Sequence, residues 1–419
     1  MTRRGFLFAG MAAAALRVDA LDTLEQASLT TDKDPEATAG DEDYWRQVRK
    51  AFDIEKDFLF LNHGGICPSP VRVEDAVERG LRTADRAPSY WVYRRQEREL
   101  EEVRKRLAKL FKCDPEELAI MPNATAGLQT VIMGHPAQSG DRVVTTSQDY
   151  PRVLTGLSQR ERRDGVRVSR VSVTAVPKSP GELVQPILDA MAQKPSMVAV
   201  PRIGYLNGTL FPVSQLAGRG VPILVDGAHG IGQLDEGAPD LKCDYYACCL
   251  HKWILGPLGS GFLYVKKSRI RDLWPLYPAD SSLDGDIRKF EQFGTRPTAI
   301  LLAIREALDC HEAIGTRRKE ARLRYLRSYW TSKLVDHPKV SFQSSLDPAL
   351  SRALTTVQIG KIEPEPLASW LFDKKRIFVT SVRHADMKGI RVSPNVFTSL
   401  TELDRLVAAL REAVDHGIS

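Results

Sequence analysis

Short apolar segments alternate with longer amphipathic ones through the middle of the chain. The apolar segments often contain β-branched residues, as buried strands do, and they cover residues 118–121, 141–146, 197–201, 223–226 and 245–250. Most of the stretches between them could hold a crossover helix. The pattern therefore predicts an α/β protein whose central sheet is mainly parallel, with helices on both faces.

The segments on either side of this region extend the prediction. Residues 71–111 are charged and have helical periodicity that breaks around Pro88, whereas 261–265 resembles a strand and 297–315 a helix. From about residue 317, a basic helix, short strands and a terminal helix predict a smaller α+β domain. The expected organisation is an N-terminal segment over 44–75, a large domain over 76–313 and a small C-terminal domain over 314–419.

The N-terminus has the pattern of a targeting signal. Arg3 and Arg4 stand directly before the apolar stretch 6–16. This arrangement resembles a twin-arginine export signal over residues 1–20, which implies a periplasmic or exported protein, with the cytoplasm as the alternative. Residues 21–43 are polar, acidic and without periodicity, and they predict a flexible leader.

Composition excludes several classes of protein. A chain of 419 residues, 43% of them hydrophobic, can bury a sizeable core. The 59 Lys and Arg residues exceed the 53 Asp and Glu residues by only six, so no nucleic-acid partner is implied. Beyond the N-terminus no apolar run approaches about 18 residues, which predicts no membrane span after signal removal. The six cysteines lack the spacing of metal ligands, and no metal site is expected.

Two strand ends carry the side chains that indicate chemistry. The strand 223–226 ends at Asp226, and the strand 245–250 leads to Lys252. Ligands of an open parallel sheet bind at the carboxyl ends of its strands, so these two side chains can face one crevice. Pyridoxal phosphate requires such a pair, because its aldehyde forms a Schiff base with a lysine and its ring nitrogen needs a carboxylate. Singly, each residue has an ordinary explanation as a helix cap or a solvated strand end.

The stretch 223–266 resembles the class V aminotransferase family of fold-type-I enzymes that depend on pyridoxal 5′-phosphate. Its His-Lys-Trp-Ile-Leu-Gly-Pro run is most similar to the isopenicillin N epimerase-like branch. The resemblance implies that Lys252 forms the internal aldimine and that Asp226 pairs with the pyridine nitrogen. It also implies that His229 lies near the phenolic oxygen or the ring of the cofactor, and His251 near its phosphate.

Other segments match the family in the same order along the chain. The resemblance places Asn62 beside the substrate and the Ala124-Thr125 turn around the cofactor phosphate. Backbone N–H groups at a helix start attract an anion, which supports this second role. By the same resemblance, Tyr150 stacks on the pyridine ring and the amide of Asn207 reaches the phenolic oxygen.

Two further residues match in the second half of the chain. Thr295, in a Gly-Thr element, resembles the residue that reaches the cofactor phosphate of the neighbouring subunit, which implies a homodimer with shared active sites. Arg391 resembles the small-domain arginine that grips the α-carboxylate of an amino acid substrate. A planar guanidinium pairs with a carboxylate through two hydrogen bonds, which a lysine cannot do.

These residues predict a pyridoxal-phosphate enzyme that acts on an amino acid through the Lys252 aldimine and a Cα carbanion, of aminotransferase or epimerase type. A C–S or β-elimination lyase is an alternative, because the same carbanion serves all these reactions. No cysteine follows Cys310, which disfavours a desulfurase that forms a persulfide on a late cysteine. A catalytically silent exported binding scaffold is an alternative of another class.

The export signal can be tested with a reporter. A fusion of residues 1–20 to a folded reporter should leave the cytoplasm, because paired arginines before an apolar stretch are read by the twin-arginine route. Replacing Arg3 and Arg4 by lysine should keep the reporter inside, as cell fractionation would measure. The prediction is wrong if the unaltered fusion stays in the cytoplasm, or if the lysine variant is exported equally well.

Overall fold

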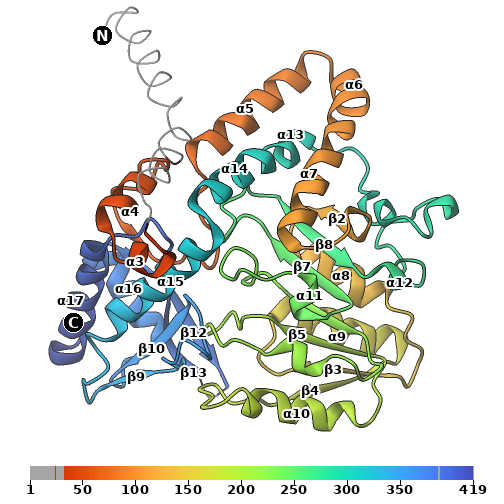
Figure 1. Ribbon diagram of the computed structural model, residues 1–419. Coiled ribbons are helices and arrows are strands. Elements are labelled where there is room, and N and C mark those ends of the chain that lie inside the picture. The colour runs from red at the N-terminus through yellow and green to blue at the C-terminus, as the bar shows by residue number, and fades with distance from the viewer. Residues whose placement is uncertain (1–23, 25–32, 386, 419) are drawn as a thin grey trace, which may run out of the picture.

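The computed structural model of the chain describes residue 24, residues 33–385 and residues 387–418 (Figure 1). The predicted export signal over 1–20 lies outside the described residues, as does part of the predicted leader. Within these ranges, none of the helices is both long and apolar enough to cross a lipid bilayer.

A seven-stranded sheet forms the centre of the larger part of the molecule, in the order β2-β8-β7-β6-β5-β3-β4 (Figure 1). The strands are β2 (Leu118–Met121), β3 (Arg142–Thr146), β4 (Arg167–Val171), β5 (Met197–Pro201), β6 (Ile223–Asp226), β7 (Tyr245–Cys249) and β8 (Gly261–Val265). β8 runs antiparallel to both of its neighbours, whereas the other pairs are parallel. The prediction of a mainly parallel sheet is therefore confirmed.

Six of the seven strands lie within one residue of the positions that the apolar segments predicted. The edge strand β4 was missed. Its sequence, Arg-Val-Ser-Arg-Val, places exposed arginines at Arg167 and Arg170 and has no continuous apolar run. An edge strand pairs on one side only, so its sequence does not need the apolar pattern of a buried strand.

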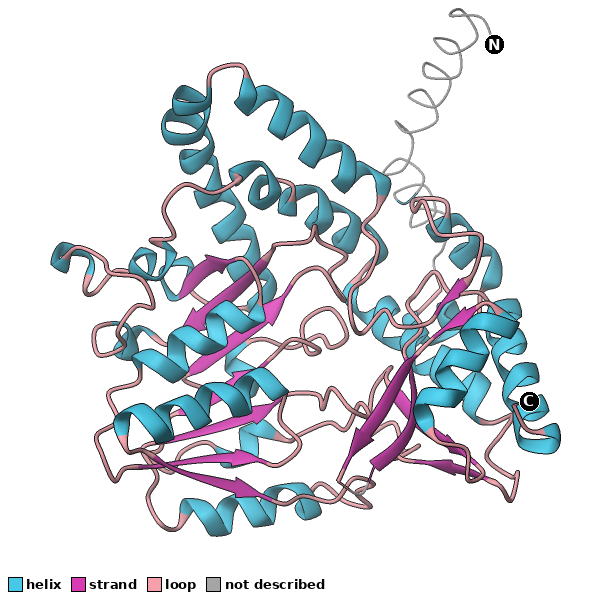
Figure 2. Cartoon of the chain, turned by 180° about the vertical axis from the view of Figure 1, so that it is seen from behind, coloured by secondary structure: helices cyan, strands magenta, loops and turns pink. Residues whose placement is uncertain are grey.

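Helices cover both faces of the sheet, as predicted (Figure 2). One face packs against α8 (Ala124–Gly134), α9 (Pro151–Asp164) and α12 (Lys267–Ile270), and the other against α7 (Glu97–Phe111), α10 (Gly181–Met191) and α14 (Ile304–Ile314). Successive side chains of a strand point to opposite faces. In β6, Ile223 and Val225 accordingly join one hydrophobic cluster and Leu224 the other. Burial on both faces explains the unbroken apolar runs.

Helix α8 approaches the sheet closely because it carries a glycine at the contact. A Cβ atom on Gly127 would lie 2.8 Å from the Cβ of Ala247 in β7, closer than two such atoms can pack. A larger residue would push the helix away from the strand. Gly127 thereby sets the distance between the start of α8 and the carboxyl end of β7.

The long helical region before the sheet is interrupted, as predicted. It consists of α5 (Val71–Asp85), α6 (Pro88–Tyr90), the π-helical segment η1 (Trp91–Gln96) and α7, with Pro88 at the start of α6. The helix predicted over 297–315 is divided into α13 (Thr298–Leu302) and α14. Shorter helical segments connect other elements: η2 (Pro115–Glu117), η3 (Val213–Leu216), α11 (Ala238–Leu241), η4 (Ser281–Leu283) and η5 (Ile287–Glu291).

The C-terminal part forms a smaller α+β unit with its own hydrophobic core, as predicted. Its antiparallel sheet has the order β12-β13-β10-β9. The elements are α15 (Thr316–Thr331), β9 (Val340–Phe342), β10 (Thr355–Ile359), α16 (Pro364–Lys375), β12 (Thr380–His384), β13 (Met387–Val392) and α17 (Leu400–His416). Trp330, Ile390 and Leu410 lie in this core.

The N-terminal segment joins the C-terminal unit. Strand β1 (Leu59–Phe60) pairs in parallel with β11 (Ile377–Phe378), and Asn62 forms a bridge with Ser393 just beyond β13. Residues more than 300 positions apart are thus held side by side. This pairing decides which side of the molecule the Asn62 side chain reaches.

The described part of the predicted flexible leader, from residue 33 on, is helical instead. Helix α3 (Pro35–Ala39) is capped by Asp34 and is followed by α4 (Glu42–Arg49). Arg322 of α15 donates to the carbonyl oxygen of Ala39 at 2.9 Å. The leader prediction fails here because the partner that stabilises α3 lies nearly 300 residues away, where local periodicity gives no sign of it.

Candidate active site

The carboxyl ends of the parallel strands bring Asp226 and Lys252 to one edge of the sheet. Asp226 ends β6 in register with Ala247 of β7, five residues before Lys252. The chain after β7 forms a loop that the hydrogen bond from Gly256 N to Leu250 O, 2.8 Å long, closes. Lys252 lies within this loop.

Asp226 is held in a tight turn and is only 8% exposed. Its Oδ1 accepts a hydrogen bond from Ala228 N at 2.9 Å. The turn needs glycine at the next position, because a Cβ atom on Gly227 would lie 2.0 Å from the ring of Tyr246. Burial raises the pKa of Asp226, while the hydrogen bond and the charge of Lys252 oppose this shift.

Burial lowers the pKa of Lys252, because an ammonium group loses its hydration there. The charge of Asp226 opposes this shift, and the charge of Arg391 adds to it. The charges of Asp226 and Arg391 therefore both act on Lys252. A lysine whose pKa is lowered has more neutral amine at neutral pH, which is the form that attacks a carbonyl carbon or accepts a proton.

Two histidines flank Lys252. His229 is buried, and its Nδ1 accepts a hydrogen bond from the indole Nε1 of Trp253 at 3.2 Å. Burial and the charge of Lys252 hold the pKa of His229 well below its usual range. His251 is partly buried, and burial together with Lys252 lowers its pKa to about 4. Both imidazoles are therefore neutral at pH 7.

The start of α8 lies beside the same strand end. Ala124 N donates to Cys249 Sγ at 3.3 Å, and Asn123 caps the helix by accepting from Ala126 N at 2.9 Å. Thr125 follows in the first turn and is half-buried. The positive end of α8 therefore lies beside Cys249, the last residue of β7, which is three residues before Lys252. The sequence predicted the cofactor phosphate at this helix start.

Arg391 reaches the site from the small unit and joins Asn62. It lies in β13, an inner strand of the small sheet. Its Nη2 donates to Asn62 Oδ1 at 2.8 Å, and its Nη1 donates to Tyr205 O at 2.6 Å. Its Nε is buried without a hydrogen-bond partner among the described residues. Burial lowers the pKa of Arg391 to about 10, so the guanidinium stays charged at neutral pH.

Tyr150 stands at the mouth of the site, 38% exposed, with its ring edge-on to that of Tyr205 at 5.4 Å. Sequence reasoning missed Tyr205. Its position four residues after the end of β5 was the available signal, because ligands of a parallel sheet bind beyond the carboxyl ends of its strands. The carbonyl oxygen of Tyr205 accepts a hydrogen bond from Arg391 and thereby orients the guanidinium group.

Asp149, which precedes Tyr150, was also missed. Its Oδ2 accepts hydrogen bonds from Thr145 Oγ1, Thr146 N and Thr146 Oγ1, each 2.8 Å long. Burial raises the pKa of Asp149 to about 7, and the charge of Asp226 adds to the shift. Asp149 and Asp226 are thus two buried carboxyl groups at this end of the site. The Asp-Tyr dipeptide after β3 was the signal, of which only the tyrosine was used.

Asn207 does not present its amide to the site. Its Nδ2 donates to the carbonyl oxygens of Ala175 and Gln343 at 2.7 and 3.0 Å, and its Oδ1 accepts from Thr209 N at 3.2 Å. These bonds occupy both ends of a fully buried amide. The predicted contact with the cofactor oxygen therefore has no support in this geometry, because the side chain is used to hold loops together.

Thr295 is also apart from the other predicted residues. It is exposed, lies between η5 and α13, and shares a 2.9 Å hydrogen bond with Tyr93 OH. Among the contacts of the described residues, none links Thr295 to Lys252.

The residues that do meet fit pyridoxal phosphate. They provide an amine with a lowered pKa at Lys252, a buried carboxylate at Asp226, the start of α8 for an anion and a guanidinium with a free buried Nε at Arg391. A mainly parallel sheet with these groups at its carboxyl edge defines a fold-type-I pyridoxal-phosphate enzyme. No group of three or more His, Cys, Asp or Glu side chains in the described chain could hold a metal ion.

Residues 79–406 match the family described as aminotransferase class-V, and the chain belongs to this family. The protein is therefore an enzyme that depends on pyridoxal 5′-phosphate, as the sequence indicated. Figure 1 places the matched residues across both units.

Relatives of two kinds are similar to the chain over most of its length. The isopenicillin N epimerase of Streptomyces clavuligerus is 26% identical over 390 residues, which cover 87% of this chain and 97% of that protein. A probable cysteine desulfurase of Methanothermobacter thermautotrophicus is 27% identical over 405 residues, 88% of this chain and 98% of that protein. The cystine C–S lyase C-DES, solved with its product cysteine persulfide, superposes with a TM-score of 0.74 at 21% identity, over 84% of this chain and 97% of that chain. The superposition confirms the fold.

Proposed function

We propose that the protein converts an amino acid by moving the proton at its Cα atom, as an aminotransferase or an epimerase does. The observation that carries the proposal is that strand pairing brings Asp226 and the half-buried Lys252 to one edge of the sheet, where the charge of Arg391 also acts on the lysine. Bound pyridoxal phosphate supplies an aldehyde for a lysine amine and a ring that withdraws electrons. The similarity to isopenicillin N epimerases over most of the chain supports this reaction class.

Each residue has a role that follows from its surroundings. The Asp226 carboxylate, which Ala228 N holds at the end of β6, would keep the ring nitrogen of the bound cofactor protonated. The Lys252 amine takes and returns the Cα proton, for which a lowered pKa is an advantage. The Arg391 guanidinium pairs with the α-carboxylate, and Asn62 orients it.

A C–S or β-elimination lyase is the second candidate, supported by the similarity to a probable cysteine desulfurase. A desulfurase that stores sulfur on a cysteine fits less well. Cys249 is the cysteine beside Lys252, but it is buried and burial raises the pKa of its thiol. A neutral, enclosed thiol is a poor nucleophile. Elimination without a protein persulfide remains compatible with this site.

The reaction class is tested by trapping and product analysis. Borohydride reduction of the protein with its cofactor should leave a pyridoxyl group on Lys252, identified by peptide mass, because its amine is the one beside Asp226. Lys252→Ala should lose the adduct and all activity, whereas Lys266→Ala, which removes an exposed lysine, should keep both. An amino acid screen then separates a keto acid, an inverted isomer and pyruvate with ammonia.

Two outcomes would contradict the proposal. A folded protein that carries no adduct on Lys252 at saturating pyridoxal phosphate would favour a silent binding scaffold. Pyruvate and ammonia as the products, without keto acid or inverted isomer, would favour the lyase.

Arg391 is expected to select substrates that have an α-carboxylate. Arg391→Lys keeps a positive charge but loses the paired hydrogen bond, so KM for amino acids should rise about 10- to 100-fold. The rate with a decarboxylated amine analogue should change little. Arg383→Lys, an exposed arginine on the neighbouring strand β12, is the matched control. An equal KM effect on both substrates would exclude carboxylate recognition by Arg391.

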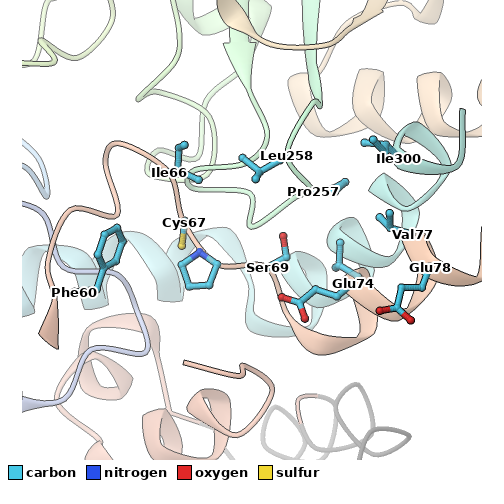
Figure 3. A pocket seen from close by; sticks show the side chains of 12 residues that line it. Phe60, Ile66, Cys67, Ser69, Glu74, Val77, Glu78, Pro257, Leu258 and Ile300 are labelled. Atoms are coloured by element: carbon cyan, nitrogen blue, oxygen red, sulfur yellow. The ribbon is translucent and has the colours of Figure 1, made fainter. Parts of the chain in front are cut away.

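We also propose a homodimer with shared active sites. Thr295 lies on an exposed loop, as a residue that serves a neighbouring subunit must. An apolar groove of about 570 Å³ lies between α5 and the loop after Lys252, and Ile66, Pro257, Leu258 and Ile300 line it (Figure 3). Ile66 and Leu258 are 51% and 60% exposed, which suits a face that a second copy covers.

The dimer is tested by light scattering. The protein should have twice the mass of one chain, and Leu258→Glu should shift it to the single-chain mass because a charge is buried in the apolar groove. Val335→Glu, at a similarly exposed apolar residue of the small unit, should leave the dimer intact. A wild-type protein with the mass of one chain, or a Leu258→Glu variant that stays dimeric, would contradict this interface.

We propose, finally, that the mature protein works outside the cytoplasm. Arg3 and Arg4 support export of a folded chain. Five of the six free cysteines are buried, so an oxidising compartment would leave their thiols unreacted.

A further inference from the structure

Trp253, the residue directly after Lys252, has a contact that the proposed reaction does not use. The side chain is fully buried, and its indole N–H donates to Nδ1 of His229 at 3.2 Å. His229 is separated from it by 24 positions in the chain and follows the turn after Asp226. A hydrogen bond between two neutral side chains thus links the strand ends that carry Asp226 and Lys252.

This hydrogen bond decides where the imidazole of His229 carries its proton. An indole nitrogen can only donate, so Nδ1 of His229 must be the acceptor and carries no hydrogen. Burial and the nearby charges of Lys252 and Arg391 keep the ring neutral. A neutral imidazole holds one proton, which is then on Nε2. The tautomer follows from the chemistry of the partner.

The other ring nitrogen is free to serve a ligand. Among the described residues, Nε2 of His229 has no hydrogen-bond partner. This atom is also not among the fully buried polar atoms, so a ligand can reach it. The charges of Lys252 and Arg391 both act on this imidazole, so the ring borders the same site. The Nε2–H group is therefore a hydrogen-bond donor available to the cofactor.

Further hydrogen bonds hold the backbones of Trp253 and His229. The ammonium of buried Lys319 donates to the carbonyl oxygen of Trp253 and contacts Nδ1 of His311 at 3.0 Å. On the other side, Gln233 Nε2 donates to the carbonyl oxygen of His229 at 2.7 Å. These bonds fix the backbone of both residues, so the indole and the imidazole have little freedom to separate.

We propose that Trp253 is a positioning residue, which holds His229 as the Nε2–H tautomer with its donor turned to the cofactor. The proposal rests on the proposed function, since it assumes pyridoxal phosphate between Lys252 and Asp226. Without the indole N–H, Nδ1 would be free to take the proton and the ring would exchange between tautomers. Trp253 then acts through His229 and does not touch the reacting atoms.

The tautomer can be measured directly by nitrogen NMR on protein labelled at its eight histidines. The His229 signals are assigned by their loss in His229→Phe. Wild type should show the Nε2–H tautomer in about tenfold excess, with and without pyridoxal phosphate. Trp253→Phe should show comparable amounts of both tautomers. Trp330→Phe is the matched control, because Trp330 is equally buried but its indole N–H has no partner among the described residues.

Cofactor affinity gives a second readout. Trp253→Phe should raise the dissociation constant of pyridoxal phosphate about 3- to 10-fold, because the donor is no longer held in place. In a His229→Phe background the same substitution should change it by less than about twofold. If Trp253→Phe does not fold, benzothienylalanine placed at residue 253 removes the N–H and keeps the shape of the ring.

The outcomes separate this inference from the proposed function. An unchanged His229 tautomer in folded Trp253→Phe, or an equal loss of affinity in both backgrounds, would overturn the role of Trp253. Absence of the Lys252 adduct would instead overturn the proposed function, and the tautomer in cofactor-free protein would still be measurable.

Discussion

The electrostatic influence of Asp226 and Lys252 on each other is the interaction on which the rest of the site depends. Each group loses hydration on burial, which raises the pKa of the acid and lowers that of the amine, and each charge opposes the shift of the other. Strand register sets their positions, since Asp226 pairs with Ala247 of β7. The glycine after Asp226 permits the turn because Tyr246 fills the space beside it.

The part of the site around Arg391 is built from segments that are far apart in the chain. Asn62 and Arg391 are separated by 329 positions, and Tyr205 comes from the large unit between them. The pairing of β1 with β11 brings Asn62 close to Arg391. The lysine is therefore positioned by the central sheet, whereas the arginine is positioned by the packing of the small unit.

Local patterns predicted most of the fold and the chemical centre of the site. Buried strands need apolar residues on both faces, so β5 and β6 were visible as unbroken runs, and Asp226 and Lys252 stood at strand ends. The edge strand β4 and the helix α3 were missed because neither needs such a run. Family resemblance added Arg391 and Asn62, which the structure joins by a 2.8 Å hydrogen bond.

The sequence by itself determined the fold class and the family, and it predicted that an amine and a carboxylate meet at neighbouring strand ends, since these features depend on short runs and their neighbours. Only the tertiary structure decided how polar side chains are used. In the folded chain the Asn207 amide donates hydrogen bonds to two backbone carbonyls, and the indole N–H of Trp253 donates one to His229. The physical reason is that a buried polar group bonds whatever packing places beside it, and those partners come from distant parts of the chain.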